Sequence, residues 1–277
     1  MNNTVFTLVT DKAYFFRAKR TITDLRSRGK WFGSIVVILV DFEIVNKNFI
    51  DFYNIETITF PPINEKNELL TLLNNRPFLD TIDNREINKL NQWEKLHVFD
   101  EYFKKWDRVV FLDAGLRVLD DVNNSVLKLD YKNKFLAPDD GGNYLFPNLK
   151  KTFKTQVTCT NENKLFELML FTNDNELLEK NYFLNCMWVY DTNILEKCSK
   201  DEMIKGITSY PICKTNEMAL MNIFLNFKYK LWERFPVRVG DDPKILFEWC
   251  ETNSPNITKW TDYNFIKYPC TISFEDT

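Results

Sequence analysis

Histidine is nearly absent from this chain of 277 residues, which contains only His97. A histidine-rich metal site is therefore excluded, and we expect His97 to be a packed or surface residue of a helix. The six cysteines show no C-x-x-C spacing and no export signal precedes them, so reduced thiols are expected. They are Cys159, Cys186, Cys198, Cys213, Cys250 and Cys270.

Long apolar runs and basic blocks are also missing. No apolar run approaches the roughly 20 residues of a membrane helix, and the longest, SIVVILVDF, has the length of a buried strand. The N-terminal sequence MNNTVFTLVTDKAY lacks the basic and apolar regions of a signal peptide. The net charge is −3, without the concentrated positive face that nucleic acid requires. We therefore expect a cytoplasmic protein without an integral membrane segment and without a nucleic-acid partner.

Strand-like and helix-like segments alternate along the chain. The apolar runs at 4–10, 34–41 and 55–60 predict buried strands, and residues 12–29 predict a helix that ends at Gly29. This alternation favours an α/β fold with parallel strands. The length allows one large domain or two small ones, and no linker or internal repeat divides the chain.

The clearest predicted helix covers residues 85–106. Its apolar residues recur at steps of three and four and form one face, with Lys95 at the edge of that face. They are Leu90, Trp93, Leu96, Phe99, Phe103 and Trp106. Further segments predict strands at 108–113, 134–138 and 182–191, and helices at 161–172 and 215–227.

Acidic residues stand at the ends of three predicted strands: Asp11, Asp41 and Asp113. Ligands of open α/β sheets bind outside the carboxyl ends of the strands. Asp113 is the most suggestive, because Ala114 and Gly115 follow it and leave room for a ligand against the backbone. An aspartate that only caps a turn explains the same pattern equally well.

The motifs around this acid resemble those of nucleotide-sugar glycosyltransferases with the GT-A fold, and the retaining glycogenin and galactinol-synthase type is nearest. RVVFLDAGLRVLDDV, preceded by EKLHVF, resembles their strand that ends in D-x-D. FTLVTDKAY resembles their opening strand and uridine-contacting turn, and LAPDD their next strand and loop. YFLNCMWVYDTNIL is similar to their F-N-S-G-V-x-V segment, and KTNEMALMNIF to their D-Q-x-x-L-N helix start. The matches follow in order over about residues 4–230, which is more specific than any one of them.

The resemblance implies a single GT-A domain over residues 1–277, with a mostly parallel central sheet. Residues up to about 115 would form the nucleotide-sugar-binding half, and residues from about 116 onward the acceptor half. Such a protein moves a hexose or N-acetylhexosamine from a UDP-sugar to a hydroxyl of a glycan or protein, with retention of configuration. The aromatic content of 15% would suit either a homodimer interface or a large core.

The resemblance also implies roles for individual residues. Leu8, Thr10 and Tyr14 would line the nucleoside pocket, and Lys95 would reach a phosphate or the donor sugar. Asp113 would bind the ribose and a Mn²⁺ or Mg²⁺ ion on the diphosphate, with Ala114 and Gly115 keeping the approach clear. Asp139 and Asn185 would contact the sugar or its acceptor, and Asn216 and Glu217 would lie beneath the anomeric carbon.

Each of these side chains also has a purely structural explanation. Lys95 could be a solvated residue at the helix edge, and Tyr14 could be ordinary core packing. Glu217 could be an acid of a first helical turn, where the helix dipole favours it. Asn185 lies among apolar residues and needs hydrogen-bond partners, for which a substrate hydroxyl is suitable.

The chain departs from the family at its metal ligands. Gly115 replaces the second acid of D-x-D, and of the C-terminal H-x-x-G-x-x-K-P-W motif only Lys267 and Pro269 remain. Asp140 or Asp262 could supply a replacement oxygen; otherwise Lys95, Arg117 and Lys267 would neutralise the diphosphate. Cys186 and Met187 replace Ser and Gly of N-S-G and would fill space near the sugar.

Two other functions remain open. The lost metal ligands would also suit an inactive sugar-nucleotide-binding or interaction protein of the same fold. A nucleotidyltransferase has a similar α/β layout, but it needs a Gly-rich phosphate loop after the first strand, and TDKAYFFRAKR contains no glycine.

Overall fold

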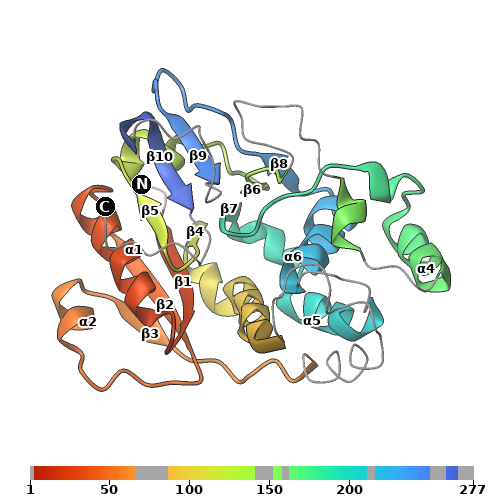
Figure 1. Ribbon diagram of the computed structural model, residues 1–277, viewed down its shortest axis with the longest axis horizontal. Helices are drawn as coiled ribbons and strands as arrows, with labels where there is room; N and C mark the ends of the chain where they lie inside the picture. Colours follow the sequence, from red (N-terminus) through yellow and green to blue (C-terminus); the bar gives the residue numbers. More distant parts are fainter. Residues whose placement is uncertain are drawn as a thin grey trace.

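The computed structural model describes residues 3–65, 87–140, 152–157, 162–210, 216–249 and 260–267. Its centre is a seven-stranded sheet with the order β3-β2-β1-β4-β7-β6-β8 (Figure 1). The neighbours β3, β2, β1 and β4 are parallel, whereas β7 is antiparallel to β4 and β6. The strands are β1 (Thr4–Asp11), β2 (Ser34–Val40), β3 (Glu56–Ile58), β4 (Arg108–Leu112), β6 (Phe135–Ala137), β7 (Met187–Asp191) and β8 (Trp232–Arg234). The expected mixed α/β fold with a mostly parallel sheet is confirmed.

A second sheet has three strands in the order β5-β10-β9. These strands are β5 (Leu116–Val118), β9 (Ile245–Trp249) and β10 (Tyr263–Lys267). β10 is antiparallel to β5 and parallel to β9, so it joins the C-terminal part of the described chain to the segment directly after Asp113. The sequence motifs did not predict this sheet.

Two apolar layers cover the two faces of the large sheet. On one face, Ala18, Ile22 and Leu25 of α1 (Phe15–Ser27) pack against β1 and β2, together with apolar residues of the small sheet. On the other face, Trp93, Leu96 and Phe99 pack with residues of α5 (Lys200–Ser209) and α6 (Asn216–Met221). Figure 1 shows α1 and α2 (Asn48–Phe52) on one side and α4 (Glu162–Thr172), α5 and α6 on the other. Because side chains alternate along β1, Phe6 and Leu8 enter one layer and Val5 and Val9 the other.

The predicted helix over 85–106 is present but divided. It consists of two 3-10 helices, η1 (Ile87–Phe99) and η2 (Glu101–Lys105), with a break at Asp100. Asp100 has an extended backbone, and its Oδ1 accepts a hydrogen bond of 2.9 Å from the Tyr102 nitrogen, so it caps the second piece. The predicted apolar face from Trp93 to Trp106 is buried, as expected.

The helix predicted at 215–227 continues beyond α6 as a π-helix, η8 (Asn222–Lys228). Asn222 is fully buried, and its Nδ2 donates to the Met218 carbonyl one turn earlier at 3.0 Å. The same amide group exchanges two hydrogen bonds with the backbone of Phe183. A side chain that intrudes on the backbone ladder in this way accounts for the wider turn.

Shorter 3-10 turns connect the remaining elements. They are η3 (Val122–Asn124), η4 (Val126–Lys128), η5 (Phe153–Gln156), η6 (Leu177–Glu179), η7 (Thr192–Glu196) and η9 (Trp260–Asp262). No helix of the described ranges is long and apolar enough to span a membrane. Cys186 and Cys198 are buried free thiols, and the other four cysteines lie outside the described residues. His97 is buried, bonds Glu94 at 2.8 Å and stacks on Phe60, which matches the expected packed helix residue.

Candidate active site

A cleft opens at the carboxyl ends of β1, β2 and β4, where a parallel sheet is expected to bind its ligand. Its volume is about 610 Å³ when the open solvent at its mouth is included. Its walls are formed by Val9, Thr10, Asp11, Tyr14, Val40, Asn91, Gln92, Lys95, Asp113, Ala114 and Lys267. Residues from distant parts of the chain therefore meet at one sheet edge.

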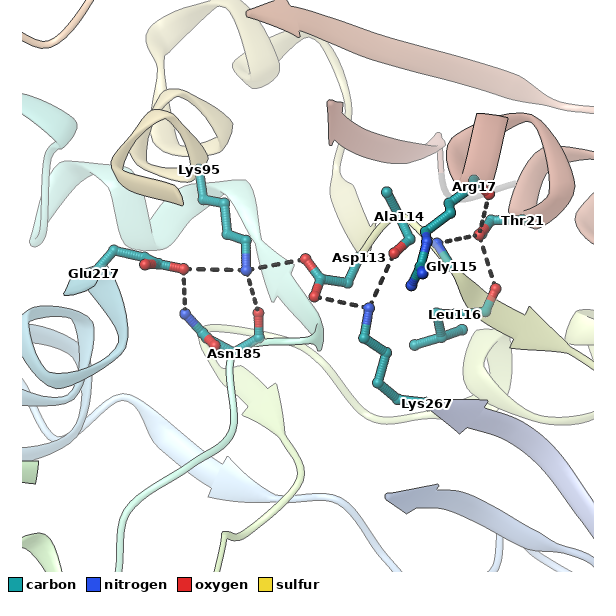
Figure 2. Close-up of polar contacts among 10 residues, drawn as sticks. All are labelled: Arg17, Thr21, Lys95, Asp113, Ala114, Gly115, Leu116, Asn185, Glu217 and Lys267. Carbon is teal, nitrogen blue, oxygen red and sulfur yellow. Dashed lines mark hydrogen bonds and ion pairs between the residues drawn. The ribbon is translucent and has the colours of Figure 1, made fainter. Parts of the chain in front are cut away.

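Asp113 begins a tight turn directly after β4. The Leu116 nitrogen donates to the Asp113 carbonyl at 3.0 Å, and Gly115, the third residue of the turn, has a φ of +90°. A turn of this kind favours glycine at its third position. The Gly115 nitrogen donates to Thr21 Oγ1 at 3.0 Å, and that hydroxyl donates to the Leu116 carbonyl at 2.8 Å (Figure 2). Gly115 therefore provides the positive φ of this turn, and it offers no carboxylate to a ligand.

Two lysines bind the carboxylate of Asp113, one on each oxygen (Figure 2). Lys95 Nζ lies 3.0 Å from Oδ1, and Lys267 Nζ lies 3.1 Å from Oδ2. Lys267 also donates to the Ala114 carbonyl at 3.0 Å. Asp113 is therefore bound by a lysine of η1 and by a lysine of β10, the last described strand.

The network continues from Lys95 to α6 and to the segment before β7. Lys95 Nζ lies 3.1 Å from Glu217 Oε1, and Asn185 Nδ2 donates to the same oxygen at 2.6 Å. The Asn185 carbonyl accepts a long bond of 3.5 Å from Lys95. Lys95, Asp113, Asn185, Glu217 and Lys267 hence form one connected cluster, and we call it the lysine–carboxylate cluster.

Burial and charge act in opposite directions on these groups. Burial would lower the pKa of Lys95, but the charges and hydrogen bonds of Asp113 and Glu217 outweigh it and raise that pKa. Loss of water would raise the pKa of Asp113, but Lys267 and Lys95 together lower it. Burial dominates at Glu217, whose pKa is raised despite the neighbouring Lys95. Both Lys95 and Asp113 are accordingly charged at neutral pH.

The sequence placed Lys95 at the edge of an apolar face, with a solvated side chain as the alternative. That alternative is wrong, because Lys95 is only 7% exposed. Tyr14 is half-buried; it packs against the α1 layer and also forms part of the cleft wall, and its contact with a base stays a prediction. Thr10 and Ala114 also line the cleft.

Other predicted site residues lie elsewhere. Leu8 is fully buried in the α1 layer, and neither Leu8 nor Gly115 is among the residues of the described cleft wall. Asp139 is buried in a bridge with Phe183, and its Oδ2 lies 3.7 Å from Arg234 Nε. The side chain of Asn216 lies outside the described residues.

Arg117 lies away from the described cleft wall, whereas the expected space-filling role of Cys186 and Met187 near the sugar stays a prediction. Arg117, predicted as a cation for the diphosphate, forms a buried pair with Asp24 and is absent from the described cleft wall. Cys186 and Met187 are buried, and burial together with Asp113 raises the pKa of the Cys186 thiol to about 12. The Cys186 carbonyl accepts from the Asp113 nitrogen at 2.9 Å, so this segment supports the turn.

Two polar residues of the cleft wall, Asn91 and Gln92, were not predicted from the sequence, and a third, Asp11, was predicted only as an acid at the end of a strand. Asp11 ends β1, and its Oδ1 accepts from the Tyr14 nitrogen at 2.9 Å, which fixes the turn that carries Tyr14. Its Oδ2 accepts from Asn91 Nδ2 at 3.2 Å. Asn91 and Gln92 lie about one turn before Lys95 on η1, and this spacing was the signal that could have found them.

The donors around Asp113 do not fit the divalent metal site that the resemblance implied. Both carboxylate oxygens already bind ammonium groups, and Gly115 has no side chain. Of the proposed replacements, Asp140 accepts a hydrogen bond from the Tyr182 hydroxyl and Asp262 is exposed on η9. No group of three or more potential ligands occurs among the residues that the structure places.

The sequence matches no protein-family model and no curated protein. Several solved structures have a similar fold. The bifunctional glycosyltransferase WbbM is similar at a TM-score of 0.58 and 15% identity, over 96% of this chain and 45% of WbbM. An active-site mutant of LgtC is similar at a TM-score of 0.57 and 13% identity, over 97% of this chain and 88% of LgtC.

Core-mannan synthase A from Aspergillus fumigatus, in an Mn/GDP form, is a third similar structure. Its TM-score is 0.53 at 9% identity, over 88% of this chain and 76% of the synthase. The chain thus spans less than half of WbbM but most of the two other glycosyltransferases. Taken with the sheet order and the cleft at its edge, these similarities show that the chain has the GT-A glycosyltransferase fold.

Proposed function

We propose that this protein is a glycosyltransferase that moves a hexose or N-acetylhexosamine from a UDP-sugar to a hydroxyl of a glycan or protein. The observation that carries the proposal is the polarity of the cleft within a GT-A fold. One part of its wall holds an aromatic ring and small polar groups, and another holds two lysines. A nucleoside diphosphate carries matching groups: a flat base suits the aromatic ring, and a doubly charged diphosphate suits the two lysines.

The nucleoside would occupy the part of the cleft beside Tyr14. Asp11 holds the backbone of Tyr14 and also bonds Asn91, so this part of the wall is ordered by its own contacts. A ring on an ordered turn offers a stacking surface for a base at a low cost in side-chain entropy. Thr10 and Gln92 would supply polar contacts to the base or ribose.

The sugar would lie between the diphosphate and the pair Asn185–Glu217. Negative charge develops on the leaving diphosphate during transfer, and ammonium groups that are already in place stabilise it. Lys95 contacts both Asp113 and Glu217, so it joins the phosphate side of the site to the sugar side. The Glu217 carboxylate would offset positive charge at the anomeric carbon, which favours transfer with retention.

We further propose that residues 1–277 act as one transferase domain with a nucleotide half and an acceptor half. The lysine–carboxylate cluster supports this reading, because Lys95 and Asp113 come from the first half and Asn185, Glu217 and Lys267 from the second. Either half alone would leave charged groups of this cluster without their partners.

A thermal-shift comparison of UDP-, GDP- and CMP-sugars tests the donor class. Ligand at about 100 times its dissociation constant adds about 2.7 kcal/mol to stability, which a melting curve resolves. We expect the largest shift with a UDP-sugar, and a reduced shift in Tyr14→Ala. Phe16→Ala is the matched control, since this nearby aromatic residue, the second of α1, is 66% exposed. A shift with GDP-sugars alone would refute the UDP assignment.

Donor hydrolysis then separates an enzyme from an inactive sugar-nucleotide-binding protein. We expect slow release of free sugar from the bound donor by the wild type, and loss of that release in Glu217→Gln at unchanged nucleotide affinity. Binding without any hydrolysis or transfer, over a panel of UDP-hexoses and UDP-N-acetylhexosamines with glycan and protein acceptors, would favour the inactive protein.

A further inference from the structure

Lys267 is held at Asp113 by the fold and is not a mobile surface lysine. In β10 it lies opposite Leu116 of β5, the residue that closes the turn begun by Asp113. Its side chain is only 5% exposed, and Nζ contacts both Asp113 Oδ2 and the Ala114 carbonyl. These two contacts with oxygen atoms fix a cation directly at the carboxylate that the resemblance had assigned to a metal.

The charges of the cluster favour an anion as the next ligand. Two ammonium groups lie within 3.1 Å of Asp113, and one of them is shared with Glu217, whose pKa is raised by burial. A divalent cation at Asp113 would have to displace both lysines and would then lie close to two positive charges. Repulsion between such charges is strong where water is partly excluded. A diphosphate is instead attracted by the two ammonium groups, because each lysine can donate an N–H to a phosphate oxygen.

We propose that Lys267, together with Lys95, takes the place of the divalent cation in this protein and neutralises the donor diphosphate directly. Asp113 is then a positioning residue that holds both lysines at the cleft, and nucleotide binding needs no divalent metal. This inference rests on the proposed function, because it assigns the diphosphate of that donor to these two lysines.

Calorimetry of UDP and GDP binding, in EDTA and in Mn²⁺, tests the inference on the full chain. For the wild type we expect the same affinity in both conditions, within about twofold. Lys267→Met keeps the length of the side chain and removes its charge. Loss of one charge-assisted phosphate contact should weaken UDP binding by about 10- to 100-fold. Because this change exposes Asp113 Oδ2, Mn²⁺ should restore part of the affinity in Lys267→Met only.

Three controls separate phosphate binding from general damage. Uridine has no phosphate, so its affinity should be equal in the wild type and in Lys267→Met. Lys267→Arg retains the charge and should keep most of the UDP affinity. Lys244→Met removes another half-buried lysine, paired with Asp120 at 2.5 Å at the far end of β9, and should bind UDP like the wild type.

The outcomes distinguish this inference from the function on which it rests. Wild-type binding of UDP or GDP that requires Mn²⁺ would overturn the role of Lys267 and leave the glycosyltransferase proposal in place. Unchanged UDP affinity in Lys267→Met would do the same. Failure of the wild type to bind any nucleoside diphosphate, with or without Mn²⁺, would overturn both.

Discussion

Replacing Lys95 by methionine should destabilise the protein through Glu217, and the loss should depend on pH. Lys95 bridges Asp113 and Glu217 at 3.0 and 3.1 Å. Asp113 keeps Lys267 in the variant, but Glu217, which is 1% exposed, is left with hydrogen bonds from the Asn185 amide and the backbone in place of an ammonium group. Removing one partner of a buried ion pair costs about 3–5 kcal/mol. We expect a loss in this range at pH 8, where the Glu217 carboxyl of the unfolded chain is fully ionised.

The sign of the pH dependence follows from the raised pKa of Glu217. Burial already raises this pKa in the wild type, and the loss of the Lys95 charge raises it further. Between the unfolded value of 4.5 and the folded value, the native state holds a proton that the unfolded chain has released. Stability therefore falls as the pH rises through this window, by about 1.4 kcal/mol per pH unit. The difference between the variant and the wild type should accordingly be smaller at pH 5 than at pH 8.

Urea unfolding of four proteins at pH 5 and pH 8 measures this effect. They are the wild type, Lys95→Met, Lys95→Met/Glu217→Gln and the control Lys244→Met. The second substitution removes the buried carboxylate, so the double variant should recover most of the lost stability at pH 8. An equal loss at both pH values, with no recovery in the double variant, would refute the reasoning and assign the effect of Lys95 to packing alone.

Three further predictions concern single groups near the site. Asp24→Asn should lower the free energy of unfolding by about 3–5 kcal/mol in urea, because Arg117 is 2% exposed and would keep a buried charge. Glu248→Gln should flatten the pH profile of stability: burial raises the pKa of Glu248 to about 7, so wild-type stability falls as pH rises from about 4.5 to 7. Gly115→Ala should destabilise the chain by about 1–3 kcal/mol in the same assay, because φ is +90° there. Equal stability of wild type and variant, or for Glu248 an unchanged pH profile, would contradict each prediction.

Much of the fold was predictable because local patterns were strong. β1, β2 and β4 are continuous runs of buried β-branched and apolar residues, and the helices predicted at 12–29 and 161–172 are present as α1 and α4. The division of the helix at Asp100 and the π-helix at Asn222 were not predicted. In both cases one polar side chain competes for backbone hydrogen bonds, and a periodic apolar pattern does not report that competition.

The candidate site, too, was only partly predictable from the sequence. The sequence by itself determined that Asp113 ends a buried strand and that Ala114 and Gly115 follow it, which placed a carboxylate at the ligand-binding edge of an α/β sheet. Only the tertiary structure decided what this carboxylate holds. Lys95 is 18 residues before Asp113 and Lys267 is 154 residues after it, so their meeting depends on β10 pairing with β5. Strand pairing between segments so distant is a property of the whole packed chain, because no local pattern in either segment specifies its partner.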